Sequence, residues 1–99
     1  MKIITQQSRD NFLAGKPFNK GNMQVRVLWT TVELRLHGNM IAYYNIDKPS
    51  KIIIQNCGWF SNTTKERLNA LPNVHIKQKN WNWYLNGEEW NGTIKEIFI

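Results

Sequence analysis

The chain has 99 residues, of which 41% are hydrophobic and 20% are charged. A chain of this length builds one core, and its apolar content excludes a disordered tail, a collagen, a coiled coil and a disulfide scaffold. Thirteen Lys and Arg residues against seven Asp and Glu residues give a formal net charge of +6, and there are five Trp residues. These counts predict a single basic, aromatic-rich domain that spans residues 1–99.

The first half of the chain predicts one helix followed by four strands. The helix is expected to begin at Thr5, its N-cap, and to stop at Gly15. Alternation of apolar and polar residues then predicts two strands with a very short link, which is typical of a β-hairpin or a bent meander. Two further strands follow this pair, and the second of them is rich in β-branched residues. The four predicted strands are Gln24–Trp29, Thr31–Leu36, Met40–Tyr44 and Lys51–Asn56.

A capping box predicts the start of a second helix. Thr63 is expected to cap the helix while Glu66 reaches back to the cap. Leu68 and Leu71 form the apolar stripe of this helix, and Pro72 with its neighbour Asn73 ends it.

The last third of the chain predicts short strands around a strong turn signal. Asn86–Gly87 is suited to a type I′ hairpin turn, after which Glu88–Trp90 returns along the preceding strand. Thr93–Ile99 is compatible with a strand or a helical turn. The two strands before the turn are Val74–Lys79 and Trp81–Leu85.

Runs of strands with two short helices predict an α+β fold. We expect one mostly antiparallel sheet of about five to seven short strands, in the order α-ββββ-α-ββ.

The tryptophans divide by their predicted environment. Trp29, Trp81 and Trp83 share strand faces with aliphatic residues, which indicates the core. Trp59 lies in the loop before the second helix, where an exposed indole is a favoured anchor of interfaces. The environment of Trp90 is left open.

No motif predicts catalysis, a metal centre or a cofactor. His37, His75 and Cys57 lack the spacing of metal ligands, and no histidine is brought to Cys57 by the sequence. A lone cysteine is most often a small packed residue. Glu88 and Glu89 are adjacent and point to opposite faces of a strand, so they cannot work as a pair. We therefore expect a protein that is not an enzyme.

Basic residues carry the main functional prediction. If their strands share a sheet, one face presents a row of cations that attracts phosphate groups. Neighbouring aromatics, among them Tyr43, Tyr44 and Tyr84, could stack on bases. Arg67 is needed neither for the cap nor for the core, which makes it the stronger functional candidate in its helix. The same cations can equally serve as a solvated face. The candidate ligand-binding residues are Arg26, Arg35, Trp59, Lys65, Arg67, Lys77 and Lys79.

Two stretches of the chain also carry a family resemblance. With shorter matches further upstream, they resemble a family of small proteins encoded by tailed bacteriophages, from residue 12 to residue 92. The resemblance implies a phage accessory protein made in the cytoplasm of the bacterial host. Small phage proteins of this kind often bind and redirect host or defence components. The stretches are Gly58–Pro72 and Trp83–Gly92, and the shorter matches are Gly21–Asn22, Val25–Val27 and Leu36–Ala42.

The compartment expected from the residues agrees with this resemblance. Cys57 is the one cysteine, so no internal disulfide calls for an oxidising compartment. The longest strongly apolar run, Ile52–Ile54, is far too short to span a membrane, and the first residues lack the apolar core of a secretory leader. We expect a cytoplasmic protein without a membrane partner.

Two binding functions are compatible with these features. In the first, the cationic, aromatic-edged face binds an anionic ligand, either nucleic acid or a nucleotide messenger of a defence system, with steep salt dependence. In the second, the protein blocks a host or anti-phage defence factor through an aromatic patch around Trp59 with a basic rim. A homodimer is a further expectation, because pairing would close the exposed edges of a small sheet.

Overall fold

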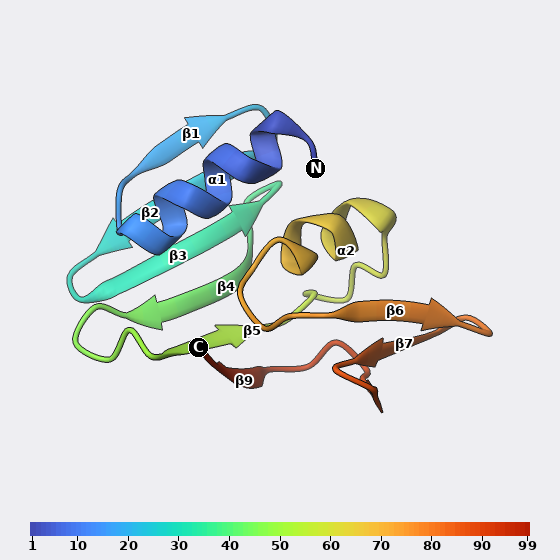
Figure 1. The fold of residues 1–99 in the computed structure, drawn as a ribbon. Helices are drawn as coiled ribbons and strands as arrows, with labels where there is room; N and C mark the ends of the chain where they lie inside the picture. Colours follow the sequence, from blue (N-terminus) through green and yellow to red (C-terminus); the bar gives the residue numbers. More distant parts are fainter.

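The computed structural model describes all 99 residues, which form two helices and nine strands in the order α-βββββ-α-ββββ (Figure 1). Helix α1 (Ile3–Ala14) ends as predicted at Gly15, whose φ of 68° is left-handed. Its start differs from the prediction, because Lys2 is the N-cap and no side chain caps the helix. Thr5 lies inside the helix and is buried, so its hydroxyl is free to bind groups of α2.

Six strands form one antiparallel sheet. The hairpin pairings of β2 with β3 and of β3 with β4 confirm the strands that alternation predicts. A three-residue strand at the edge was not predicted, because it is too short to show alternation. The end of the chain is a strand that pairs with β5. In spatial order the strands are β1 (Phe18–Lys20), β2 (Met23–Leu28), β3 (Thr31–Leu36), β4 (Asn39–Asn45), β5 (Lys51–Ile54) and β9 (Lys95–Phe98).

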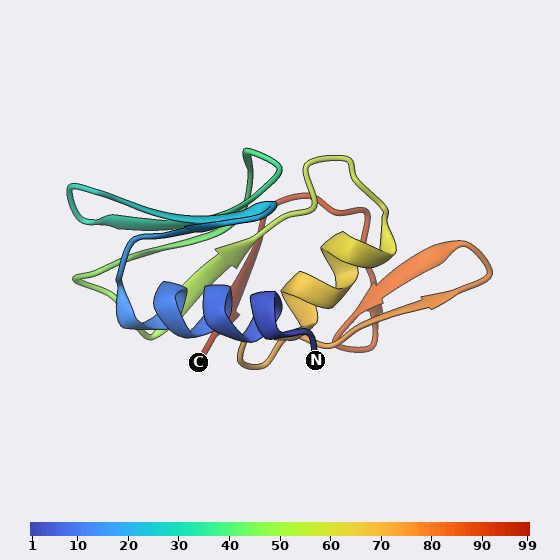
Figure 2. The same cartoon turned by 90° about the horizontal axis from the view of Figure 1, so that it is seen from above.

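Both helices lie on the same side of this sheet, α1 across it and α2 beside the ends of its strands, and the opposite face carries no helix (Figures 1 and 2). Inward residues of the predicted strands, such as Val25, Leu34 and Ile52, pack there with Phe12 of α1 in one buried cluster. Tyr44 reaches from β4 to α1, where its ring meets Phe12 edge-on at 5.0 Å and its hydroxyl donates to the Phe12 carbonyl at 2.7 Å. The core therefore joins α1 to the centre of the sheet.

Helix α2 (Asn62–Asn69) forms where predicted, with a different cap. Ser61 is the N-cap, and its hydroxyl accepts from the amide of Thr64 at 3.1 Å. Thr63 lies in the first turn of the helix, and Glu66 does not reach back to the cap. The capping-box prediction was wrong, whereas the buried stripe of Leu68 and Leu71 is confirmed.

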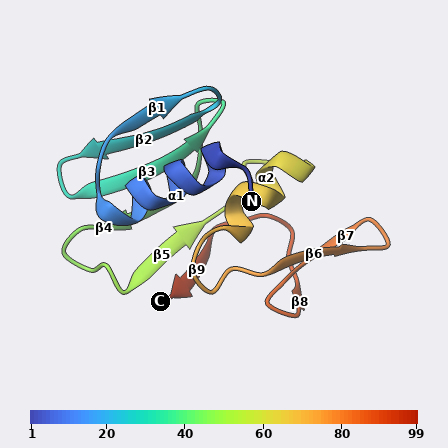
Figure 3. The same ribbon diagram turned by 45° about the horizontal axis from the view of Figure 1, so that its top comes forward.

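The remaining strands form a separate three-stranded antiparallel sheet. It consists of β6 (Ile76–Lys79), β7 (Asn82–Leu85) and β8 (Glu88–Glu89). Asn86 and Gly87 have φ values of 52° and 88°, so the predicted type I′ turn is confirmed. The β6–β7 hairpin projects away from α1 and the six-stranded sheet (Figures 2 and 3). The α+β class is confirmed, with the strands divided between two sheets.

The predicted core positions of Trp29 and Trp81 are wrong. Trp29 is 97% exposed and Trp81 is 91% exposed, because both lie in two-residue hairpin loops beyond the ends of their strands. Trp83 is buried in the core as predicted, and Trp90 is buried as well. Alternation thus identifies the strands but runs past their ends into the turns.

Candidate functional site

The candidate cations do not form one continuous sheet face. Arg26 and Arg35 lie on β2 and β3 of the six-stranded sheet, whereas Lys77 and Lys79 lie on β6 of the other sheet. Lys65 is on α2. The shared sheet on which the predicted row of cations depends is therefore absent.

Pairing with acidic and carbonyl groups reduces what the first pair of arginines offers to a ligand. Arg35 donates from Nε to Glu33 Oε1 at 3.0 Å and from Nη1 to the Gly38 carbonyl at 2.8 Å. Arg26 is exposed, but it faces the same Glu33 across the β2–β3 ladder. This part of the sheet surface therefore carries mixed charge.

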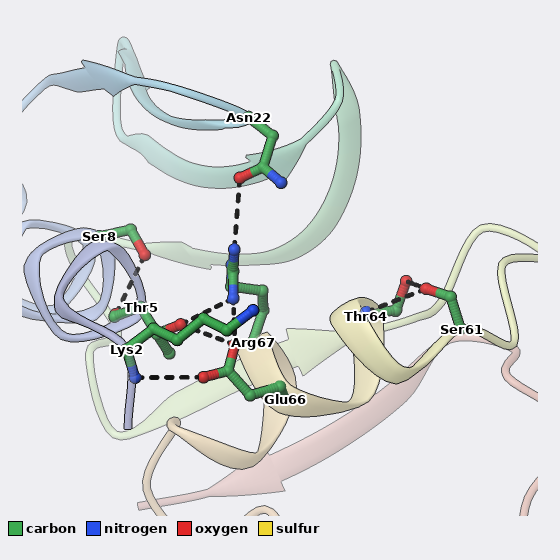
Figure 4. A network of polar contacts seen from close by, with 8 residues as sticks. All are labelled: Lys2, Thr5, Ser8, Asn22, Ser61, Thr64, Glu66 and Arg67. Carbon is green, nitrogen blue, oxygen red and sulfur yellow. Dashed lines mark hydrogen bonds and ion pairs between the residues drawn. The ribbon is translucent and has the colours of Figure 1, made fainter.

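Arg67 has a structural role, contrary to the prediction. Its side chain is only 4% exposed, and its Nη1 donates to Thr5 Oγ1 at 2.8 Å and pairs with Glu66 Oε1. Its Nη2 lies 3.4 Å from Asn22 Oδ1 in the β1–β2 turn. Figure 4 shows how this one guanidinium connects α2 with α1 and with that turn. Arg67 is therefore not available to a ligand.

The same network lowers the pKa of Glu66. Partial burial acts to raise this pKa, but it is outweighed by hydrogen bonds from the Thr5 hydroxyl and the Lys2 amide and by the charge of Arg67. The carboxylate thus remains ionised and completes the junction between the two helices.

A hollow of about 600 Å³ lies along the projecting hairpin. Its aromatic walls come from three places in the chain: the loop before α2, the β6–β7 hairpin and the residue that follows β8. We call it the aromatic cleft. It is lined by Phe60, Trp81, Asn82, Trp83, Glu89, Trp90 and Asn91.

Trp83 is the buried centre of the aromatic cleft. Its side chain is 1% exposed, Phe60 meets its ring edge-on at 5.0 Å, and the Trp90 ring lies 6.2 Å away. Lys65 Nζ lies 5.9 Å from the centre of the same ring and donates to Gln78 Oε1 at 2.9 Å. The indole Nε1 of Trp83 is buried without a hydrogen-bond partner. The cleft therefore has one fixed wall on which other aromatic side chains rest.

Trp81 is the exposed wall of the aromatic cleft. It follows Asn80 in a two-residue turn, and its φ of 71° lies in the left-handed region that bulky residues avoid. Such a conformation costs about 1–2 kcal/mol for an L-residue, and the exposed indole recovers little of it by burial. Trp29, at the tip of the other hairpin, has the same strain, so Trp81 is distinguished by the hollow that it lines.

Trp59, the predicted contact residue, does not line the aromatic cleft. It is 59% exposed and lines a smaller hollow of about 290 Å³ with His37 of the β3–β4 turn and residues at the start of α2. Trp59 therefore remains an exposed aromatic residue, on a different part of the surface.

Cys57 is exposed rather than packed. Its thiol donates to the carbonyl of Met40 at 3.0 Å. Desolvation raises the pKa of this thiol more than the charge of Arg35 lowers it, so the group is not an activated thiolate at neutral pH.

Sequence reasoning missed Trp81, Glu89 and Trp90 as site residues. Asn80 before Trp81 was an available signal, because Asn favours the first position of a type I′ turn and would have placed Trp81 at the second. The approach of Trp90 to Trp83 depends on the path of the chain after β8 and has no local signal.

The structure offers neither a metal centre nor a membrane-spanning helix. No group of three or more His, Cys, Asp and Glu side chains is placed to hold a metal ion. None of the helices has the length and apolar character needed to cross a bilayer.

Comparison with known proteins identifies a family. The family described as Kyanoviridae Gp96 protein matches residues 1–98. No curated protein and no solved structure matches the chain significantly. The resemblance to phage proteins is thereby confirmed and extends through the C-terminal strand. The chain belongs to the Kyanoviridae Gp96 family, a family of cyanophage proteins.

Proposed function

We propose that this protein is a non-enzymatic accessory protein that binds a host or anti-phage defence protein in the cytoplasm of the host cell. Its binding surface is the aromatic cleft, and the observation that carries the proposal is Trp81. This indole is 91% exposed at the tip of a projecting hairpin, in a strained conformation, and lines the cleft.

The composition of the aromatic cleft supports protein binding. Trp and Tyr are enriched among the residues that contribute most to protein–protein affinity, and they act best at the centre of a partly pre-formed pocket. Trp83 and Trp90 are already packed, so they need no ordering on binding. Trp81 then offers a large apolar surface at low entropic cost.

A binding role is better supported than a catalytic role. The most reactive side chain of the chain, Cys57, hydrogen-bonds a backbone carbonyl and has a raised pKa. A nucleophile needs a neighbouring base or a lowered pKa instead.

A capture experiment from infected host cells tests the proposal. Tagged wild-type protein, Trp81→Ala and Trp29→Ala are compared, because Trp29 is an equally exposed tip residue outside the cleft. Loss of a central indole anchor costs 2 kcal/mol or more, so we expect retention of a specific partner to fall about 30-fold or more for Trp81→Ala. Trp29→Ala is expected to retain it. Equal retention by the two variants would contradict the proposal.

A second candidate function is anion binding by the outward face of the three-stranded sheet. Lys77 pairs across the ladder with Tyr84, and Lys79 with Asn82, so two cations and one aromatic ring share this face with Glu89, which pairs with Tyr84 on its other side. His75, Lys77 and Tyr84 also line a hollow of about 420 Å³. Single-stranded nucleic acid is bound by such combinations, with affinity that falls steeply with salt.

Titration with single-stranded RNA, single-stranded DNA and a nucleotide panel at low salt tests this candidate. Binding that is weakened by replacing Lys77 and Lys79 with Gln would support it, with Arg26→Gln as the matched control. Absence of binding at low salt would exclude it.

A further inference from the structure

We infer that the aromatic cleft receives a cationic side chain, with arginine preferred, from a basic segment of the partner protein. This inference rests on the proposed function and names the chemistry of its partner. It comes from the one ionisable residue in the lining of the cleft, which is a carboxylate in a chain of net charge +6.

The lining of the aromatic cleft contains one ionisable side chain, and it is a carboxylate. Glu89 lies on β8, opposite Tyr84 in the ladder, and lines the cleft together with the aromatic rings. The ion pairs of the structure use Asp10, Glu33, Glu66 and Glu96, so Glu89, like Asp47 and Glu88, takes part in none of them. A chain with a net charge of +6 thus has one acidic residue in the lining of its aromatic hollow, on the sheet face that also carries Tyr84 and Lys77.

The aromatic rings add to the attraction for a cation. The faces of indole and phenyl rings carry negative potential and attract ammonium and guanidinium groups. Within the protein this attraction already holds Lys65, whose Nζ lies 5.9 Å from the centre of the Trp83 ring. Trp81, by contrast, has no cation over its ring and is exposed to solvent. It is therefore the ring that remains open to a cation supplied by a partner.

A neutral oxygen atom completes the recognition of a cation. Asn82 lines the aromatic cleft and its side chain makes no hydrogen bond within the protein, whereas the Asn91 Oδ1 already accepts two, from the amide and hydroxyl of Thr93. A planar guanidinium can stack on an indole while its edge donates to a carboxylate, which an ammonium group cannot do. Arginine therefore fits this combination better than lysine.

The same chemistry disfavours an anionic occupant. A nucleotide would stack on the rings but would bring its phosphate close to Glu89, and like charges in a partly desolvated site repel. The hollow of about 600 Å³ also exceeds what one guanidinium fills, which leaves space for the residues beside it in a peptide.

NMR titration of the whole protein tests the inference. The Trp indole N–H signals are followed during addition of N-acetyl-arginine amide, of its neutral counterpart N-acetyl-citrulline amide, and of uridine monophosphate. We expect saturable shifts of the Trp81 signal with the arginine compound alone, at an affinity in the millimolar range. Glu89→Gln is expected to weaken this binding about fivefold, because the variant keeps the shape and removes the charge. Glu88→Gln, which changes the neighbouring residue outside the cleft, is the matched control.

Three results would overturn the inference: equal binding of the citrulline compound, saturable binding of uridine monophosphate in place of arginine, or no effect of Glu89→Gln. If one of these occurs while capture of a partner still depends on Trp81, the proposed function stands and only its chemistry is wrong. If arginine binds as expected while capture does not depend on Trp81, the inference stands and the proposed function fails.

Discussion

The six-stranded and the three-stranded sheet each end a hairpin with an exposed tryptophan, and the two surroundings differ. Trp29 and Trp81 have φ values of 57° and 71° and are both almost fully exposed. Beside Trp29, Leu28 and Ile46, whose amide donates to the carbonyl of Thr30, are themselves exposed. Around Trp81 three other aromatic side chains and a carboxylate line a hollow. Both tryptophans are exposed and have a strained backbone, but only Trp81 lies beside a hollow that other side chains line.

The largest expected effect is a loss of stability at Trp83, the buried wall of the aromatic cleft. It distinguishes this residue from Trp81, the exposed wall. Trp83→Ala removes an indole that is 1% exposed, and we expect it to lower the free energy of unfolding by about 3–5 kcal/mol. Trp81→Ala, two positions earlier, is expected to change it by less than about 0.5 kcal/mol. Urea unfolding followed by far-ultraviolet circular dichroism measures both. Equal effects would mean that Trp81 belongs to the packed core.

The next effect concerns the network that holds the helices of the main body together. Arg67→Met is expected to lower the free energy of unfolding by about 3 kcal/mol, because Glu66 and Thr5 would lose their buried partner. Because Glu66 is partly exposed, the expected loss of stability lies at the low end of the range for broken buried ion pairs. Arg26→Met changes an exposed cation on the sheet and is the control. A loss of similar size in Arg26→Met would contradict this assignment.

The same network makes the main body sensitive to acid. The pKa of Glu66 is lower in the folded chain than the value of about 4.3 typical of an unfolded chain. Its contribution to stability is therefore complete above pH 4.3 or so and is lost as the pH falls through the folded pKa. Urea unfolding between about pH 5 and pH 2 should show this loss in the wild type and a smaller loss in Glu66→Gln. Identical pH profiles of the wild type and Glu66→Gln would exclude Glu66 as a source of the acid sensitivity.

The smallest expected effect is a gain in stability at both hairpin tips. Glycine adopts a positive φ freely, so Trp29→Gly and Trp81→Gly should each raise the free energy of unfolding by about 0.5–1 kcal/mol after the entropic penalty of glycine. Urea unfolding detects a change of this size. A loss of stability at either tip would show that its indole supports the fold.

Local sequence patterns were sufficient to predict most elements of the fold. The strands around Val25 and Leu34 follow from alternation, the strand around Ile52 follows from its β-branched residues, and the type I′ turn follows from Asn86–Gly87. The same alternation wrongly placed Trp29 and Trp81 in the core. Each is an apolar residue that continues the alternation of the adjoining strand into a two-residue turn. Caps were harder, since Ser61 and Thr63 are both good N-caps and lie close together.

The candidate site was mostly beyond prediction, because its contacts join distant parts of the chain. Arg67 was predicted to be free, yet it binds Thr5, which is 62 positions away. The sequence does not predict the environment of Trp90, which follows β8 and packs on Trp83. Such contacts depend on how the helices and sheets dock, which no local pattern records. The predicted roles of Lys65, Lys77 and Lys79 in ligand binding stay predictions.

Partner binding by Trp81→Gly is the most direct test of the aromatic cleft as a binding surface. This variant removes the indole while relieving the backbone, so a loss of binding cannot be attributed to unfolding. We predict a protein that unfolds at higher urea concentration than the wild type and fails to retain the partner captured by Trp29→Gly. A stabilised Trp81→Gly protein that retains this partner as well as Trp29→Gly does would contradict the account.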